Sequence, residues 1–144
     1  MEEKEDINAL DEIHKGACMG IDAISFVLDK VEDDKLKKEL EKEEKDYNAI
    51  KKNIEDIYPK YNEGKPHETG AMTKAMTWSG IEMKTMTDKS NSKIAELLLQ
   101  GVNMGIIEGR RILNKKKINQ EVESIVSNYV TMQEKSMESL KKFL

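Results

Sequence analysis

GVNMGIIEG (residues 101–109) lies inside a stretch that otherwise has the pattern of a helix, and it places glycines four residues apart. GACMG (residues 16–20) repeats that spacing near the N-terminus. A glycine inside a helix costs roughly 0.5–1 kcal/mol relative to alanine, so this arrangement requires a compensating gain. Residues i and i+4 share one helix face, so each run forms a groove without side chains. We call these runs the glycine ladders and expect their members to pack against other helices in a tightly crossed bundle: Gly16, Gly20, Gly101, Gly105 and Gly109.

The composition suits one helical-bundle domain over residues 1–144. Charged residues make up 36% of the chain and aromatic residues 5%, with two prolines, which favours exposed helices over a β-sandwich or barrel. The net charge is −4, and lysine outnumbers arginine 22 to 2. Because a nucleic-acid-binding domain normally carries a basic surface, we expect no nucleic-acid partner.

The single cysteine, Cys18, excludes an internal disulfide and suits a reducing compartment. No apolar run approaches the ~18 residues that a membrane-spanning helix needs. The N-terminal sequence MEEKED is acidic, whereas a signal peptide begins with basic residues. We therefore expect a cytoplasmic protein that does not associate with a membrane.

Apolar residues in the first half of the chain recur at alternating steps of three and four, as in the seam of an antiparallel or coiled-coil-like helix pair. This spacing predicts a helix over residues 4–31, with His14 on the seam, and a second helix that ends near Pro59. Asp33 or Asp34 can cap the second helix. The apolar stripe of this helix is interrupted by one polar residue, which is either Glu43 or Glu44. The stretch from residue 61 to 69 has the composition of a loop.

The region from about residue 70 to 114 is too long for one helix matched to the first two. Its apolar pattern changes phase near Asp88, Ser90 and Ser92, which are all good N-cap residues. We therefore predict helices over about 70–87 and 91–114, followed by a last helix over about 118–143. The short helix then serves either as a crossover or as a kinked extension of the next one.

At this level the chain resembles a group of uncharacterised bacterial ferritin-like helical proteins. The resemblance is carried by GACMG, IEMKTMTDKS, IAELLLQGVNMGI and the closing LKKFL, and it is most specific from residue 81 to 107. It implies an all-α, ferritin-like up-down helical bundle with a helical crossover or a broken third helix. It implies no activity, because this group has no assigned biochemistry.

The metal site of ferritin-like proteins needs a Glu-x-x-His motif on each of two helices and a glutamate on each of the others. His14 and His67 are the only histidines, and neither follows a glutamate by three residues, so the standard di-iron site is absent. A weaker metal site remains open: Asp11 and His14 share a helix face, and Glu44, Glu96 or Glu134 would supply further carboxylates. The alternative is a core-edge histidine that hydrogen-bonds a neighbouring side chain.

Methionines form a stripe on the predicted helix 70–87: Met72, Met76, Met83 and Met86. Thioether clusters can select Cu(I), but methionine is also an ordinary filler of irregular cores. We favour core packing for this stripe, with Trp78 beside it as a packing or interface aromatic.

Polar residues from three predicted helices reach about the same height in the bundle, near Gly20: Glu43 or Glu44, Gln100 and Gln133. Either they rotate outward, or they form a buried polar layer that hydrogen bonds, water or a small ligand must satisfy. A buried glutamate in such a layer must be protonated or meet a cation.

Three functions stay open. The leading one is a non-catalytic structural or interaction protein that forms a homo-oligomer through a bundle face, because the strongest sequence features concern helix packing. The second is a ferritin-like metal-binding or redox protein with a degenerate site. The third is a binding module for a small molecule or a partner peptide. We identify no catalytic residue and no cofactor beyond the metal ion of the second reading.

Overall fold

The computed structural model describes residues 2–144, with side chains from Lys4 onward, and these residues form helices without any β-strand. The expected all-α fold class is confirmed. The elements are α1 (Glu2–Leu28), α2 (Asp34–Ile57), a 3-10 turn (Tyr58–Lys60), α3 (Ala71–Thr85), α4 (Asn91–Lys115) and α5 (Gln120–Lys141).

Side-chain caps set the starts of three helices. Asp33 caps α2 by accepting a hydrogen bond from the backbone N–H of Leu36 at 2.9 Å, and Asn119 caps α5 in the same way. Ser90 caps α4, at the phase change seen in the sequence. The predicted first helix was three residues too long at its C-terminus, because Val31 is buried in the connection to α2 and not in α1.

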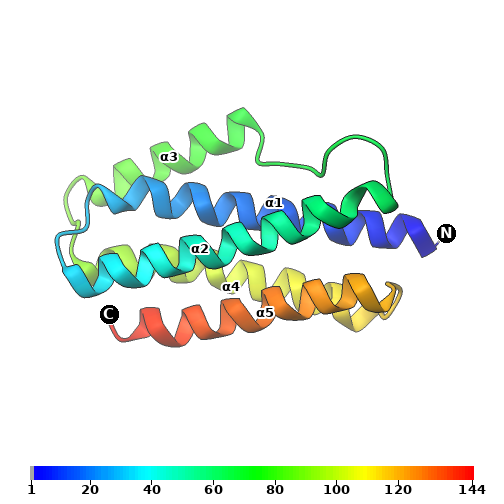
Figure 1. Cartoon of the computed structure of the whole chain (residues 1–144). Coiled ribbons are helices and arrows are strands. Elements are labelled where there is room, and N and C mark those ends of the chain that lie inside the picture. The colour runs from blue at the N-terminus through cyan, green and yellow to red at the C-terminus, as the bar shows by residue number, and fades with distance from the viewer. Residues whose placement is uncertain (1) are drawn as a thin grey trace.

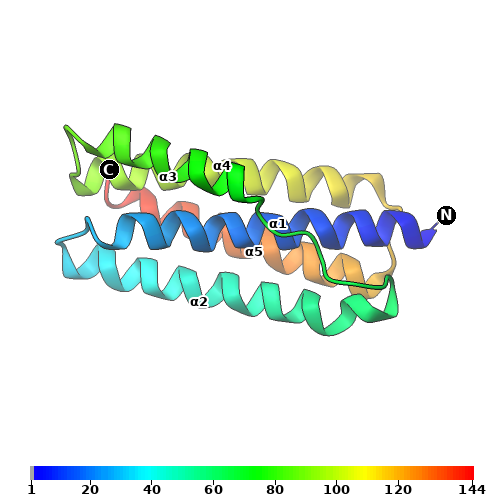
Figure 2. The same ribbon diagram turned by 90° about the horizontal axis from the view of Figure 1, so that it is seen from above.

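The four long helices lie side by side as a bundle, and α3 lies outside it against α1 (Figures 1 and 2). Helix α1 pairs with α2, and α4 pairs with α5, each pair being antiparallel. Because the connection between α2 and α4 returns along the bundle, α2 and α4 run in the same direction (Figure 1). Helix α3 is part of this connection and runs opposite to α4, so it is a crossover and not an extension of α4.

Helix α3 is only lightly attached to the bundle. It buries Ile81 and Thr85. One ion pair joins Lys74 to Asp22 of α1, and another joins Glu82 to Lys30 in the connection that follows α1. The prediction that the methionine stripe packs in the core was wrong. Because α3 covers the bundle from outside, most of its surface faces solvent, and these side chains are 49–78% exposed: Met72, Met76, Trp78, Met83 and Met86.

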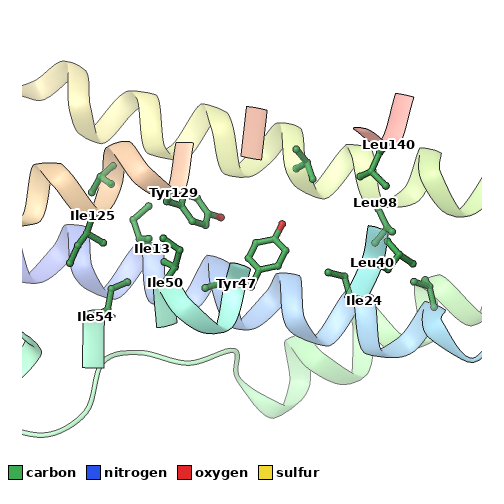
Figure 3. Close-up of a cluster of buried hydrophobic side chains, with 14 of the residues drawn as sticks. Ile13, Ile24, Leu40, Tyr47, Ile50, Ile54, Leu98, Ile125, Tyr129 and Leu140 are labelled. Atoms are coloured by element: carbon green, nitrogen blue, oxygen red, sulfur yellow. The ribbon is translucent and has the colours of Figure 1, made fainter. Parts of the chain in front are cut away.

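The core runs along the inside of the four long helices (Figure 3). Ile13, Ile24, Leu40, Ile54 and Leu140 are at most 2% exposed and belong to this core. Tyr47 and Tyr129 project from α2 and α5 into its middle (Figure 3). Within residues 2–144, no helix combines the length and apolar character needed to cross a bilayer.

Candidate functional site

A cavity of about 460 Å³ opens between α1, α3 and α4, with its floor on α2 and α5. Its walls are mainly apolar and include these side chains: Ile13, Met19, Ile24, Ile81, Leu98 and Val102. Four members of the glycine ladders also line it, namely Gly16, Gly20, Gly101 and Gly105. The ladders therefore help to shape a ligand-sized space as well as a helix crossing.

The ladder glycines make room for side chains from α2 and α5. A Cβ atom on Gly20 would lie 2.5 Å from Cζ of Tyr47, and one on Gly16 would lie 2.7 Å from the Tyr129 hydroxyl. A Cβ atom on Gly105 would lie 2.4 Å from Nε2 of Gln133. These glycines are required because two buried tyrosines and a glutamine occupy the grooves, whereas the sequence predicted that another helix would fill them.

The two remaining ladder glycines, Gly109 and Gly101, differ in their surroundings. Gly109 lies against Val130 of α5, where a Cβ atom would come within 2.4 Å of Cγ2, so it packs against another helix as expected. The expectation was wrong for Gly101, where an added Cβ would have no neighbour within 4 Å. Gly101 is exposed because it lies where the cavity opens between α4 and the loosely attached α3.

A row of hydrogen bonds forms the polar part of the floor. The Tyr47 hydroxyl donates to Oε1 of Gln133 at 2.7 Å, and Nε2 of Gln133 donates to the Tyr129 hydroxyl at 3.0 Å. Burial raises the pKa of both tyrosines, so both remain protonated at neutral pH. Because the Tyr129 oxygen accepts from Gln133, its own proton is available for a bound molecule.

Glu43 is the most buried acidic side chain in the lining, with an exposed fraction of 2%. The carboxyl group of Glu39 and the hydroxyl of Ser136 lie within hydrogen-bonding range of Glu43, and the Oε2 atoms of both glutamates are buried from solvent. Burial, together with the neighbouring carboxyl of Glu39, raises the pKa of Glu43 to about 9, although Ser136 and Lys42 act in the opposite direction. Glu43 is therefore protonated and neutral at pH 7.

The structure brings together part of the polar layer considered from the sequence. Glu43 and Gln133 are both buried and line the cavity. Gln100 also lines the cavity but is exposed, and Glu44 is half-buried and lies outside the lining. Tyr129 also belongs to this polar layer, although the sequence did not single it out as a polar group. Its seam position at the height of a glycine ladder was the signal that would have found it.

The predicted metal ligands do not form one site. Asp11 and His14 are buried close together on α1, as their spacing predicted. Glu96 pairs instead with Lys93 at 2.8 Å, and Glu134 pairs with Arg110 at 3.3 Å, both on the surface. Within the described part of the chain, no group of three or more His, Cys, Asp or Glu residues is placed to hold a metal ion.

His14 has a structural role of its own. Its Nδ1–H donates to the backbone oxygen of His67 at 2.7 Å, and Nε2 lies 3.0 Å from Oε2 of Glu55. Burial lowers the pKa of His14, but its contacts with Cys18, the His67 carbonyl and Glu55 outweigh this effect and raise the pKa to about 9. The protonated ring donates through both nitrogens, so neither is free to bind a metal.

Asp11 also forms hydrogen bonds with the segment that follows α2. One of its oxygens accepts hydrogen bonds from the Tyr58 hydroxyl at 2.9 Å and from the backbone N–H of His67 at 3.0 Å. Asp11 and His14 therefore hold the connection between α2 and α3 against α1. This arrangement matches the alternative in which His14 is a hydrogen-bonded core histidine.

No protein-family model, curated protein or solved structure matches this chain. Its function is therefore inferred from the geometry of the cavity.

Proposed function

We propose that this protein is a non-catalytic binding module that holds a small organic molecule in the cavity between α1, α3 and α4. The observation that carries the proposal is a largely apolar space of about 460 Å³ with a hydrogen-bonding floor. Ligand pockets typically have apolar walls and a few convergent polar groups that orient the ligand. Here Tyr129, Gln133 and Glu43 are those polar groups.

The character of the floor supports binding over proton-transfer chemistry. Tyr47 and Tyr129 have raised pKa values, and Glu43 is neutral at pH 7, so these groups keep their protons at neutral pH. A general acid or base works best with a pKa near the operating pH. The floor is therefore suited to hydrogen bonding with a bound molecule.

The proposal can be tested with phenylnaphthylamine, an apolar dye whose fluorescence rises when it leaves water. Gly101→Leu would place an apolar side chain at the cavity opening, where an added Cβ has open space, so the fold should tolerate it. We expect the affinity for the dye to fall by at least about tenfold in this variant. Asn103→Leu is the control, because residue 103 is exposed on the same helix but lies outside the cavity lining. Equal dye binding by the two variants would refute the proposal.

For the fold, we propose a ferritin-like bundle, as the resemblance implied. Ferritin-like bundles have one long crossover connection among four helices. The connection from α2 to α4, which contains α3, has this form (Figure 2). An experimental structure in which α2 and α4 run in opposite directions would contradict this proposal.

A second proposal is self-association through α3, as expected for a homo-oligomeric interaction protein. The supporting observation is the exposed methionine stripe of α3, where Met72 is 78% exposed and Met83 is 72% exposed. Large exposed apolar patches commonly mark protein interfaces. Met83→Glu should convert the oligomer to a monomer in sedimentation equilibrium, whereas Asn53→Glu, on an exposed part of α2, should not. A wild-type chain that sediments as a monomer would refute this proposal.

A further inference from the structure

We propose that the molecule held in the cavity is neutral and carries a carbonyl oxygen on an apolar body, and that the hydroxyl group of Tyr129 donates a hydrogen bond to this oxygen. The inference rests on the proposed function, because it assumes that the cavity holds a ligand. It adds the chemical class of that ligand and the residue that selects it.

The hydroxyl end of Tyr129 lies beside residues that line the cavity, and it points toward the middle of the bundle (Figure 3). A Cβ atom added to Gly16 of α1 would lie 2.7 Å from this oxygen, and one added to Gly105 of α4 would lie 2.8 Å from it. Both glycines line the cavity, as does Tyr129 itself. The other end of the ring is deeper, since its Cδ2 atom lies near Gly109, which is outside the lining. Because Gly16 and Gly105 have no side chains, neither position covers the hydroxyl group.

The Tyr129 hydroxyl group has a proton left to donate. Its oxygen accepts a hydrogen bond from Nε2 of Gln133 at 3.0 Å, and Oε1 of Gln133 accepts the proton of Tyr47 at 2.7 Å. A glutamine between two hydroxyl groups accepts from one and donates to the other, so one tyrosine of the row keeps an unused proton. Folded proteins rarely leave a buried donor unpaired, because this is unfavourable. A bound molecule can supply the acceptor for this proton.

A carbonyl oxygen suits this floor better than a ligand group that also has to donate. The Oε1 atom of Gln133 is already paired with Tyr47, and the Oε2 atom of Glu43 is closed to solvent beside Glu39. A ligand hydroxyl or ammonium group would bring hydrogens for which these two oxygens offer no open acceptor. A carbonyl group accepts hydrogen bonds and brings no hydrogen that needs a partner.

The surroundings of the hydroxyl group favour a neutral acceptor over a carboxylate. Burial raises the pKa of Tyr129, and the carboxyl group of Glu108 on α4 raises it further, although Gln133 acts in the opposite direction. Negative charge at this hydroxyl group is therefore unfavourable, and a ligand carboxylate would place such a charge beside it. The exposed or half-buried charged residues of the lining balance in sign, so they do not offset this effect: Glu12, Lys15, Lys84 and Glu108.

The test compares acetophenone with ethylbenzene, in which a methylene group replaces the carbonyl group. Displacement of phenylnaphthylamine gives the affinities, once the affinity for the dye itself is known for each variant. Tyr129→Phe removes only the hydroxyl group. We expect this variant to bind acetophenone about fivefold to tenfold more weakly than the wild-type protein and to bind ethylbenzene equally well. Benzoate, which carries a carboxylate in place of the ketone, should bind the wild-type protein at least about tenfold more weakly than acetophenone.

Tyr61→Phe is the control, because it removes the hydroxyl group of a tyrosine outside the cavity lining, and it should leave both affinities unchanged. Infrared spectroscopy of isotope-labelled acetophenone gives a second measurement on the wild-type protein, which does not depend on the folding of Tyr129→Phe. A hydrogen bond weakens the carbonyl bond, so the stretching frequency of bound acetophenone should lie below its value in an apolar solvent.

The outcomes separate this inference from the proposed function. Acetophenone that binds Tyr129→Phe as tightly as the wild-type protein, or an equal loss of acetophenone and ethylbenzene, would overturn the inference but leave the proposed function standing. The same conclusion would follow from an unshifted carbonyl frequency, from benzoate that binds as tightly as acetophenone, or from a bound dye that acetophenone does not displace. Failure of the wild-type protein to bind the dye or any of the probes would refute the proposed function itself.

Discussion

Gly20→Ala is the sharpest test of why the glycine ladder on α1 exists. The new Cβ atom would lie 2.5 Å from Cζ and 2.7 Å from both Cε atoms of Tyr47. The Tyr47 ring is 4% exposed, and its hydroxyl group is hydrogen-bonded to Gln133, so the ring cannot turn away freely. The methyl group therefore has to displace a buried ring or the helix that carries it.

Two effects of opposite sign act at Gly20. Alanine favours the helix by roughly 0.5–1 kcal/mol relative to glycine, whereas overpacking in a filled core costs about 1–3 kcal/mol. Gly101→Ala gains the same helical preference without the clash, because an added Cβ there has no neighbour within 4 Å. The difference between the two variants therefore isolates the overpacking cost of about 1–3 kcal/mol.

Thermal unfolding followed by circular dichroism measures this difference. For a domain of this size, 1 kcal/mol corresponds to roughly 4 °C in Tm. We expect Gly101→Ala to melt above the wild-type protein and Gly20→Ala to melt about 4–12 °C below Gly101→Ala. If Gly20→Ala is stabilised as much as Gly101→Ala, the Tyr47 ring does not fill the groove, and the account of the ladder given above is wrong.

Two further predictions concern buried polar groups, and a third concerns iron. The pKa of His14 is raised from 6.5 to about 9, so its protonation contributes roughly 3 kcal/mol below pH 6.5, and this contribution is lost as the pH rises to about 9. Urea unfolding at several pH values should show this loss, together with one from Glu43 in the same direction, and His14→Gln should make the dependence shallower. Tyr47→Phe removes the donor to Gln133 and should lower the free energy of unfolding by about 1–3 kcal/mol; an unchanged urea midpoint would mean that the row of hydrogen bonds contributes nothing. The purified protein should contain no stoichiometric iron and show no ferroxidase activity, and elemental analysis that finds two iron ions per chain would refute this.

The sequence predicted the helices well because their signals are local. Apolar residues at alternating steps of three and four mark each buried stripe, and Asp33 and Ser90 are recognisable as caps from the sequence alone. The break between the third and fourth helices followed from the same signals and lies at residues 86–90. The unusual glycine spacing was equally visible, and it correctly indicated crowding at Gly16, Gly20, Gly105 and Gly109.

The partners of those residues were decided by tertiary structure. A helical pattern shows which face is buried, but not which neighbouring side chain lies opposite it, because that depends on the rotation and register of another helix. For this reason the sequence left Glu43 and Glu44 as alternatives, and the structure places Glu43 in the cavity.

The same reasoning explains the two largest differences between expectation and structure. The methionine stripe on α3 has the spacing of a core stripe, yet it is exposed because α3 lies outside a bundle that four other helices complete. His14 and Asp11 have the spacing of metal ligands, yet the connection between α2 and α3 supplies hydrogen-bond partners to both. By itself the sequence therefore determined where helices form and which faces are buried, since both follow from neighbours along the chain. Only the tertiary structure decided that the glycines leave room for a ligand-sized cavity, since its walls come from helices that are distant in sequence.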